Sequence, residues 1–146
     1  MTSFSDIRKL YEVNLFALMK MCQLAIRPMS RQKKGIIINI SSTAAQEVYV
    51  GNSIYGASKA AVVSFTESLA AELAPLGIRV NTVAPGLTAT DMSSVFEGEN
   101  PNLPLERSAL GRKIEPFEIA DVVVALTSDK LRMINGQMIK VNGGAK

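Results

Sequence analysis

Three short runs of apolar, mostly β-branched residues most constrain the fold of this chain. They predict buried strands at about 35–41, 79–84 and 137–141. Helical patterns lie before, between and after them, at about 4–30, 54–75 and 116–128. Such alternation is typical of a parallel sheet joined by right-handed crossovers. We therefore expect an α/β fold that forms part of one domain over residues 1–146.

Composition excludes several classes of protein. The 146 residues, 47% apolar and 20% charged, suit one globular domain. There is no histidine and a single cysteine, Cys22, so we expect no metal site, no histidine-based triad and no internal disulfide. Cys22 is expected to pack in the core or an interface. The apolar stretch 13–26 is interrupted by Lys20 and is too short to span a bilayer. With no signal-peptide pattern at its start, the chain is expected to be cytoplasmic.

Tyr55 and Lys59 carry the strongest chemical signal. They are four residues apart in the second predicted helix and so share one face. A lysine ammonium near a phenol stabilises the phenolate, so that the phenol can exchange a proton with a carbonyl or alcohol oxygen. Taken alone, a Tyr-x-x-x-Lys pair fits an ordinary solvated helix face better. Its meaning depends on the motifs around it.

Those motifs follow the strands in a fixed order. Ser41-Ser42 follows the first strand, Pro85-Gly86 ends the second, and Gly143-Gly144 closes the third. With Tyr55 and Lys59 between them, the chain resembles the carboxy-terminal half of the short-chain dehydrogenase/reductase family, most of all its 3-oxoacyl-(acyl-carrier-protein) reductases. The resemblance covers nearly all 146 residues. It implies a partial Rossmann-like, doubly wound parallel sheet of about three strands with flanking helices.

The resemblance implies four catalytic residues. Ser42 would hold and polarise the substrate carbonyl, and Tyr55 would donate the proton in reduction and accept it in oxidation. Lys59 would stabilise the phenolate and bind the nicotinamide ribose. Asn14, in the first helix, would order a water relay to the lysine. Alone, the serine would better fit a cap at the end of a strand, and the asparagine would fit a hydrogen-bonded packing residue.

A nicotinamide cofactor is also implied, with NADP slightly favoured over NAD. Its nicotinamide end would be bound by Tyr55 and Lys59 together with Pro85, Gly86, Thr88 and Thr90. We expect Gly86 to supply a backbone φ that other residues resist. A Pro-Gly-x-Thr sequence alone would indicate only a turn. Asn135 and Asn142 stand where the family more often has threonine and aspartate.

The glycine-rich, phosphate-binding turn that begins this family's fold is not found in the sequence. We expect roughly ninety residues of the usual fold to lie outside the chain. The first strand would then be a bare sheet edge, and residues 1–146 by themselves would be inactive. The choice between NAD and NADP would also be made outside the chain. DNA upstream of Met1 would show whether a glycine-rich segment precedes it.

The sequence indicates the substrate and the partners less specifically than the cofactor. We expect a small or carrier-bound carbonyl substrate, such as a 3-oxoacyl thioester, with Asn52 beside Ser42 and Tyr55 on the substrate side. Basic residues end the first helix, at Arg27, Arg31, Lys33 and Lys34. They suit either the helix dipole or an acidic carrier protein, but Leu76 replaces a second basic position of carrier-dependent reductases.

The apolar first helix and the small-residue second helix predict a homo-oligomer, either a dimer or a tetramer. Nucleic acid and membrane partners are not expected. Residues 87–113 read as a long loop, which is often a functional lid. The alternative is a truncated, non-catalytic family member that serves as an oligomerisation or interaction module.

Overall fold

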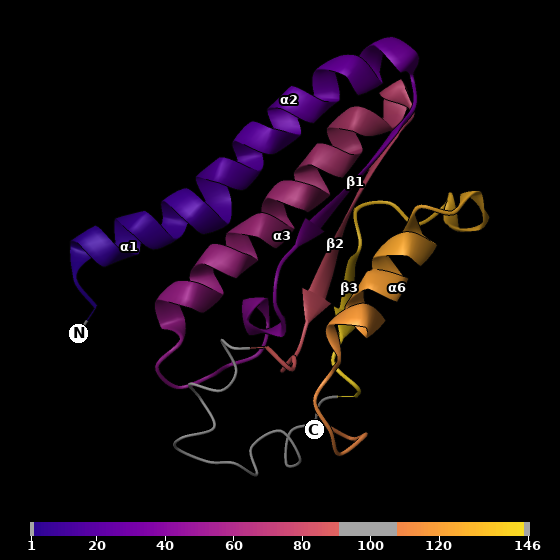
Figure 1. The fold of residues 1–146 in the computed structure, drawn as a ribbon. Coiled ribbons are helices and arrows are strands. Elements are labelled where there is room, and N and C mark those ends of the chain that lie inside the picture. The colour runs from indigo at the N-terminus through magenta and orange to yellow at the C-terminus, as the bar shows by residue number, and fades with distance from the viewer. Residues whose placement is uncertain (1, 91–107, 145–146) are drawn as a thin grey trace.

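The structure, a computed structural model, describes residues 2–90 and 108–144. Its centre is a parallel sheet of three strands in the order β1-β2-β3 (Figure 1). The strands are β1 (Gly35–Ile40), β2 (Ile78–Pro85) and β3 (Met138–Val141). Both strand pairs are parallel. The predicted α/β class, the strand positions and their parallel arrangement are therefore confirmed.

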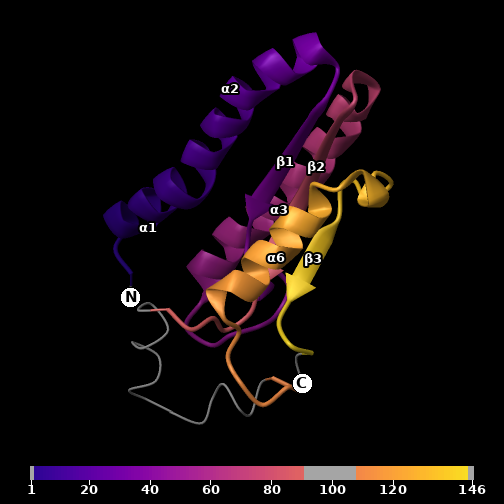
Figure 2. The same cartoon turned by 45° about the vertical axis from the view of Figure 1, so that its right-hand side comes forward.

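The helices form a layer on each face of the sheet. Helices α1 (Phe4–Tyr11), α2 (Ala17–Gln32) and α3 (Ser53–Leu73) lie on one face, and α6 (Pro116–Leu126) lies on the other (Figures 1 and 2). Short 3₁₀ turns occur at η2 (Thr43–Ala45), η3 (Ala74–Leu76) and η4 (Asp129–Leu131). This is the doubly wound arrangement that the resemblance implied.

The first helix differs from the prediction of one regular helix over 4–30. Its N-terminal cap is Ser3, whose hydroxyl accepts a hydrogen bond from the Asp6 N–H at 3.2 Å. A π-helical segment, η1 (Glu12–Phe16), then separates α1 from α2. Such a segment widens the turn and redirects the side chains that follow, a change that apolar periodicity does not reveal. Asn14 lies inside it.

The core lies between the sheet and its helices. Strand β2 is buried from Ile78 to Ala84 apart from the half-buried Arg79, as expected for a central strand covered on both faces. The side chains of Val62, Val80 and Val83 have no exposed surface. Each buried aliphatic side chain of this size contributes about 1.5–3 kcal/mol relative to exposure. The core thus fixes α3 over β2.

Strand β1 lies at an edge, as predicted, because β2 is its only partner among the described residues. Its start is set by a close approach of two turns. Gly77 follows η3 with a φ of 70°, and a Cβ there would stand within 2.3 Å of the Lys33 carbonyl oxygen. Only glycine meets both demands, so the turn before β2 packs on the turn before β1.

The predicted lid, residues 87–113, falls mostly outside the described residues. Its described ends meet, since Thr88 forms a parallel bridge with Ile114. The Ile114 N–H donates to the Leu87 carbonyl, and the Ala89 N–H donates to the Ile114 carbonyl. The two described ends of the segment therefore lie side by side, just beyond the end of β2.

Candidate active site

The predicted site residues come together at the carboxyl edge of the sheet. Helix α3 begins beside the ends of β1 and β2, so Tyr55 and Lys59 lie in its first two turns at this edge (Figure 1). The Lys59 ammonium donates to the Ile40 carbonyl at 3.4 Å, and the Ser41 hydroxyl donates to the Lys59 carbonyl at 2.8 Å. These bonds tie the second turn of α3 to the end of β1.

Tyr55 and Lys59 are neighbours in space, as their spacing predicts. The Nζ atom of Lys59 lies 5.8 Å from the centre of the Tyr55 ring. Burial lowers the pKa of the Lys59 amine, because desolvation disfavours its charged form. The pair therefore combines a phenol with a half-buried amine, which is a combination suited to proton transfer.

Ser42 lies two residues beyond Ile40, the last residue of β1. Its backbone is extended, and its hydroxyl oxygen accepts a hydrogen bond from the Ala44 N–H at 3.2 Å. The residue is thus the N-terminal cap of η2, which is a structural role that needs no catalysis. A capping hydroxyl that accepts one bond still has its own proton to donate. Ser42 can therefore cap the turn and also donate to a carbonyl oxygen.

Asn14 reaches the same site from the π-helical segment. Its Nδ2 atom donates to the Ser58 hydroxyl at 3.1 Å, and that hydroxyl donates to the Tyr55 carbonyl at 2.7 Å. Ser58 has no exposed surface. Ser58 was not predicted as a site residue, although a serine three residues after Tyr55 on a helix is placed to bond back to that carbonyl.

The predicted cofactor residues follow the end of β2. Pro85 is its last residue, and the Gly86 N–H donates to the Val141 carbonyl at 2.8 Å. The expectation of an unusual φ at Gly86 is wrong, because its φ is not positive. Space is the reason for glycine: a Cβ there would stand 2.9 Å from the Asn142 Cβ. Gly86 therefore lets the ends of β2 and β3 approach closely.

The remaining predicted positions are placed less specifically. The Thr88 hydroxyl donates to the Gly86 carbonyl at 3.0 Å, which closes the turn after β2. Thr90 is exposed just beyond it. Asn52 is half-buried at the start of α3 and makes no side-chain capping bond. All three lie on loops at the carboxyl edge, where ligands bind in open α/β sheets.

A second polar group, not anticipated from the sequence, anchors the loop before α3. The Glu47 carboxylate accepts hydrogen bonds from the Tyr49 hydroxyl and, at 3.4 Å, from the Lys140 ammonium. The Tyr49 and Thr43 hydroxyls are 3.2 Å apart. Lys140 lies on β3, so the loop that follows Ser42 is fastened across the sheet. No short-range sequence pattern signals this contact.

Cys22 is a core residue, as expected. It is buried, and its thiol donates to the Asn39 Oδ1 at 3.5 Å. Burial raises the pKa of this thiol, because desolvation disfavours the thiolate. A buried thiol that stays protonated is inert, so Cys22 is not a nucleophile.

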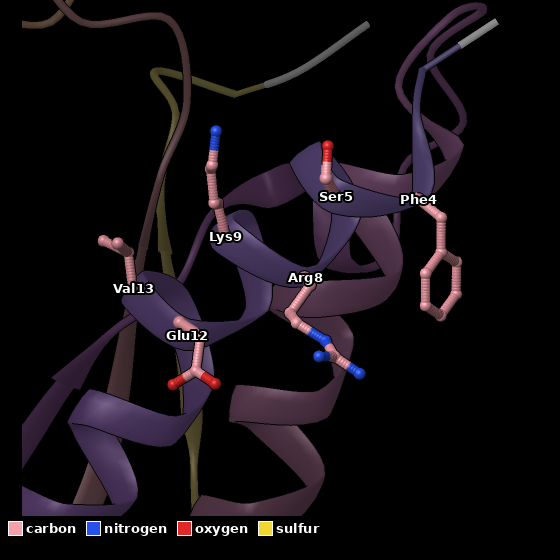
Figure 3. A pocket seen from close by; sticks show the side chains of 6 residues that line it. All are labelled: Phe4, Ser5, Arg8, Lys9, Glu12 and Val13. Atoms are coloured by element: carbon pink, nitrogen blue, oxygen red, sulfur yellow. The ribbon is translucent and has the colours of Figure 1, made fainter.

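An open hollow of about 580 Å³ lies on the first helix rather than at this edge (Figure 3). Its lining residues come from α1 and η1, and they are Phe4, Ser5, Arg8, Lys9, Glu12 and Val13. None of the predicted site residues lines it. It is therefore separate from the candidate active site.

Within residues 2–90 and 108–144, no three His, Cys, Asp or Glu side chains are grouped so that they could hold a metal ion. In the same part of the chain, no helix combines the length and the hydropathy needed to cross a membrane.

The fold and the site together define a partial Rossmann-like parallel sheet with a tyrosine–lysine pair at its carboxyl edge. A family model described as enoyl-(acyl carrier protein) reductase matches residues 1–146. The chain belongs to this short-chain dehydrogenase/reductase family.

Individual proteins of this family are similar to the chain in sequence and in structure. Over 142 residues the chain is 41% identical to the 3-oxoacyl-[acyl-carrier-protein] reductase FabG of Aquifex aeolicus (strain VF5), covering 97% of this chain and 57% of the relative. It superposes with a TM-score of 0.93 and 30% identity on a 7α-hydroxysteroid dehydrogenase complexed with NADH and 7-oxo glycochenodeoxycholic acid, covering 99% of this chain and 57% of that one.

A gluconate 5-dehydrogenase from Burkholderia cenocepacia J2315, in complex with NADP and tartrate, is also similar. The TM-score is 0.94 at 28% identity, over 98% of this chain and 57% of that one. The chain therefore spans somewhat more than half the length of the proteins that it matches.

Proposed function

We propose that this chain supplies the catalytic part of a nicotinamide-dependent oxidoreductase, which interconverts a carbonyl and a hydroxyl group by hydride transfer. The observation that carries the proposal is the Lys59 amine 5.8 Å from the Tyr55 ring at the carboxyl edge of the sheet. Asn14 is connected to the same turn of α3 through Ser58. Similarity to a reductase and two dehydrogenases supports this reading.

Each residue has its own part in the reaction. The Ser42 hydroxyl donates to the substrate carbonyl oxygen and polarises it. Tyr55 gives its proton to that oxygen in reduction and takes it back in oxidation. The Lys59 ammonium stabilises the phenolate that results. Asn52 borders the substrate, and Asn14 orders water toward the lysine.

The donors at this edge suit the nicotinamide end of the cofactor, which supplies the hydride when bound. A lysine ammonium has three N–H donors, and one is directed at the Ile40 carbonyl. Two donors remain for the adjacent hydroxyl groups of a ribose. Pro85, Gly86, Thr88 and Thr90 would border the nicotinamide carboxamide. NADP and NAD are both compatible with these residues. The similar hydroxysteroid dehydrogenase structure contains NADH, and the similar gluconate 5-dehydrogenase structure contains NADP.

The substrate that we propose is a 3-oxoacyl thioester, following the similarity to the Aquifex aeolicus reductase. Other carbonyl compounds are the alternative, because steroid and sugar-acid dehydrogenases share the fold. Lys33 is exposed after α2 and could contact an acidic carrier. Leu76 is also exposed, and it provides no second basic contact. Activity on acetoacetyl thioesters with and without a carrier protein would separate these substrates.

We also propose that the protein self-associates through its first helix. Large apolar side chains are exposed along it, namely Phe4, Val13, Phe16, Met21 and Leu24. An uncovered apolar stripe of this length is unusual on a monomer. Light scattering of the natural protein should show a dimer or tetramer, and a dilute stable monomer would contradict this.

The decisive experiment is Tyr55→Phe in the natural protein that contains these residues. We expect turnover to be abolished while the circular dichroism spectrum stays unchanged, because only the exchangeable proton is removed. Ser53→Ala, at an exposed position two residues earlier in α3, is the matched control and should retain activity. Near-normal turnover of Tyr55→Phe would contradict the mechanism.

The alternative, a non-catalytic module, is tested with residues 1–146 alone. We expect this polypeptide to bind neither NADPH nor NADH with micromolar affinity, and to be inactive, because the described contacts reach only the nicotinamide and its ribose. Isothermal titration measures this. Absence of turnover in the natural protein as well would favour the module.

A further inference from the structure

We infer that Ser58 is a positioning residue of the proposed reaction, which holds Asn14 and the backbone of Tyr55 in one geometry. The inference rests on the proposed function, since it concerns residues assigned there. Ser58 has no exposed surface and lies between two of the proposed catalytic residues. Its hydroxyl is 3.1 Å from the Asn14 Nδ2 and 2.7 Å from the Tyr55 carbonyl oxygen.

The direction of these two bonds follows from elementary chemistry. A backbone carbonyl can only accept a hydrogen bond, so the Ser58 hydroxyl must donate its one proton to the Tyr55 carbonyl oxygen. The Ser58 oxygen is then only an acceptor toward Asn14. The Asn14 side chain must present its NH₂ group and not its carbonyl. Ser58 therefore selects one of the two amide orientations of Asn14.

The second bond acts on the backbone of the catalytic pair. In an α-helix the Tyr55 carbonyl accepts from the N–H four residues later, which is that of Lys59. The Ser58 hydroxyl bonds to this same carbonyl. A serine that bonds back in this way bends the local helix. Ser58 thus acts where the backbone links the proton donor to its lysine.

The π-helical segment explains why such a support is needed. Asn14 lies in η1, where the i→i+5 pattern of a π-helix interrupts the regular α-helical hydrogen bonding. The bond to Ser58 joins η1 to α3 across 44 residues of sequence. Without it, the Asn14 amide could rotate and its helix could move relative to Tyr55.

The kinetic test uses the natural protein and the variant Ser58→Ala. We expect kcat to fall about ten- to a hundredfold with little change in KM, because misplacement of catalytic groups lowers the rate of the chemical step. Ser58→Cys keeps a weak donor and should recover part of kcat. Ser64→Ala, an exposed serine of the same helix, is the matched control. An unchanged kcat in Ser58→Ala would overturn the inference.

Coupling to Asn14 separates positioning from a general loss of packing. If the two residues act as one unit, Asn14→Ala combined with Ser58→Ala should be about as slow as the worse single variant. Independent effects would multiply, and that result would overturn the inference.

A second measurement is made on the natural protein and does not depend on activity. In protein labelled with ¹⁵N at Asn and Gln, the Asn14 side-chain NH₂ should exchange with solvent at least tenfold more slowly than that of Gln23, which is exposed on α2. Loss of the signal in Asn14→Asp assigns it. Exchange as fast as that of Gln23 would overturn the inference. Slow exchange without any carbonyl reductase activity would support Ser58's placement and reject the proposed function.

Discussion

The Asn39 side chain on β1 donates a 2.8 Å hydrogen bond to the Thr66 hydroxyl on α3, and both residues are buried. Thr66 is three helical turns beyond Tyr55 on the same helix. The bond therefore fixes the position of α3 along the direction of β1. It thereby sets where Tyr55 lies relative to the carboxyl end of that strand. The Cys22 thiol donates to the other end of the same amide, which extends the connection to α2.

Thr66→Val should test this connection. The substitution keeps the shape of the side chain but leaves the Asn39 NH₂ buried without its acceptor. We expect the free energy of unfolding to fall by about 1–3 kcal/mol. Urea denaturation measures the change. Ser68→Ala, at an exposed position of α3, should change it by less than about 0.5 kcal/mol. If the two substitutions lowered the free energy of unfolding equally, the bond between Asn39 and Thr66 would not contribute to stability in the way proposed.

Gly86→Ala should destabilise the protein through a clash rather than through backbone strain. The added methyl group would stand 2.9 Å from the Asn142 Cβ, so the ends of β2 and β3 must separate. We expect a loss of about 1–3 kcal/mol in the free energy of unfolding. Asn142→Gly removes that Cβ and should restore part of the loss. Asn142→Ala retains it and should not, which makes the pair of second-site variants a direct check.

Lys59 should make stability depend on pH at the alkaline end. Burial lowers its folded-state pKa below the ordinary 10.5, so between these two pKa values the unfolded chain binds more protons. The contribution of Lys59 to the free energy of unfolding therefore rises with pH in this window. Unfolding measured from pH 8 upward should show this rise, and Lys59→Met should lack it. The exposed Lys20→Met is the control, and an identical loss there would contradict the assignment.

Glu118 should report on the start of α6 at acidic pH. Its carboxylate binds both guanidinium nitrogens of Arg112, at 2.6 and 2.7 Å, and accepts from the Glu115 N–H. Arg112 first, and then the Glu115 N–H, lower the pKa of Glu118 to about 2. Because the folded-state pKa is depressed, the stabilisation is present above the ordinary 4.5 and is lost as pH falls toward 2.

The measurement compares unfolding of the natural protein and Glu118→Gln between pH 2 and 6. The natural protein should lose stability more steeply below pH 4.5 than the variant does. Glu67→Gln, at an exposed position on α3, serves as the control. Parallel pH profiles for the natural protein and Glu118→Gln would contradict the role of the ion pair.

Local patterns in the sequence were enough to predict the sheet and the proximity of Tyr55 and Lys59. Strands and helices follow from apolar periodicity, which is local, so their places were predicted to within a few residues. Tyr55 and Lys59 are four residues apart on one helix, and helical geometry alone makes them neighbours. The order of motifs was enough to identify the family.

The contacts that support Tyr55 and Lys59 could not be predicted from the sequence and follow from tertiary packing. The π-helical segment at Asn14 and the close packing at Gly86 leave no periodic signal. The bond from Asn14 to Ser58 joins residues 44 apart in sequence, and that from Lys140 to Glu47 joins residues 93 apart. Such contacts depend on the distances between packed elements. A periodic pattern specifies which face of an element is buried, but not which polar groups of two elements meet.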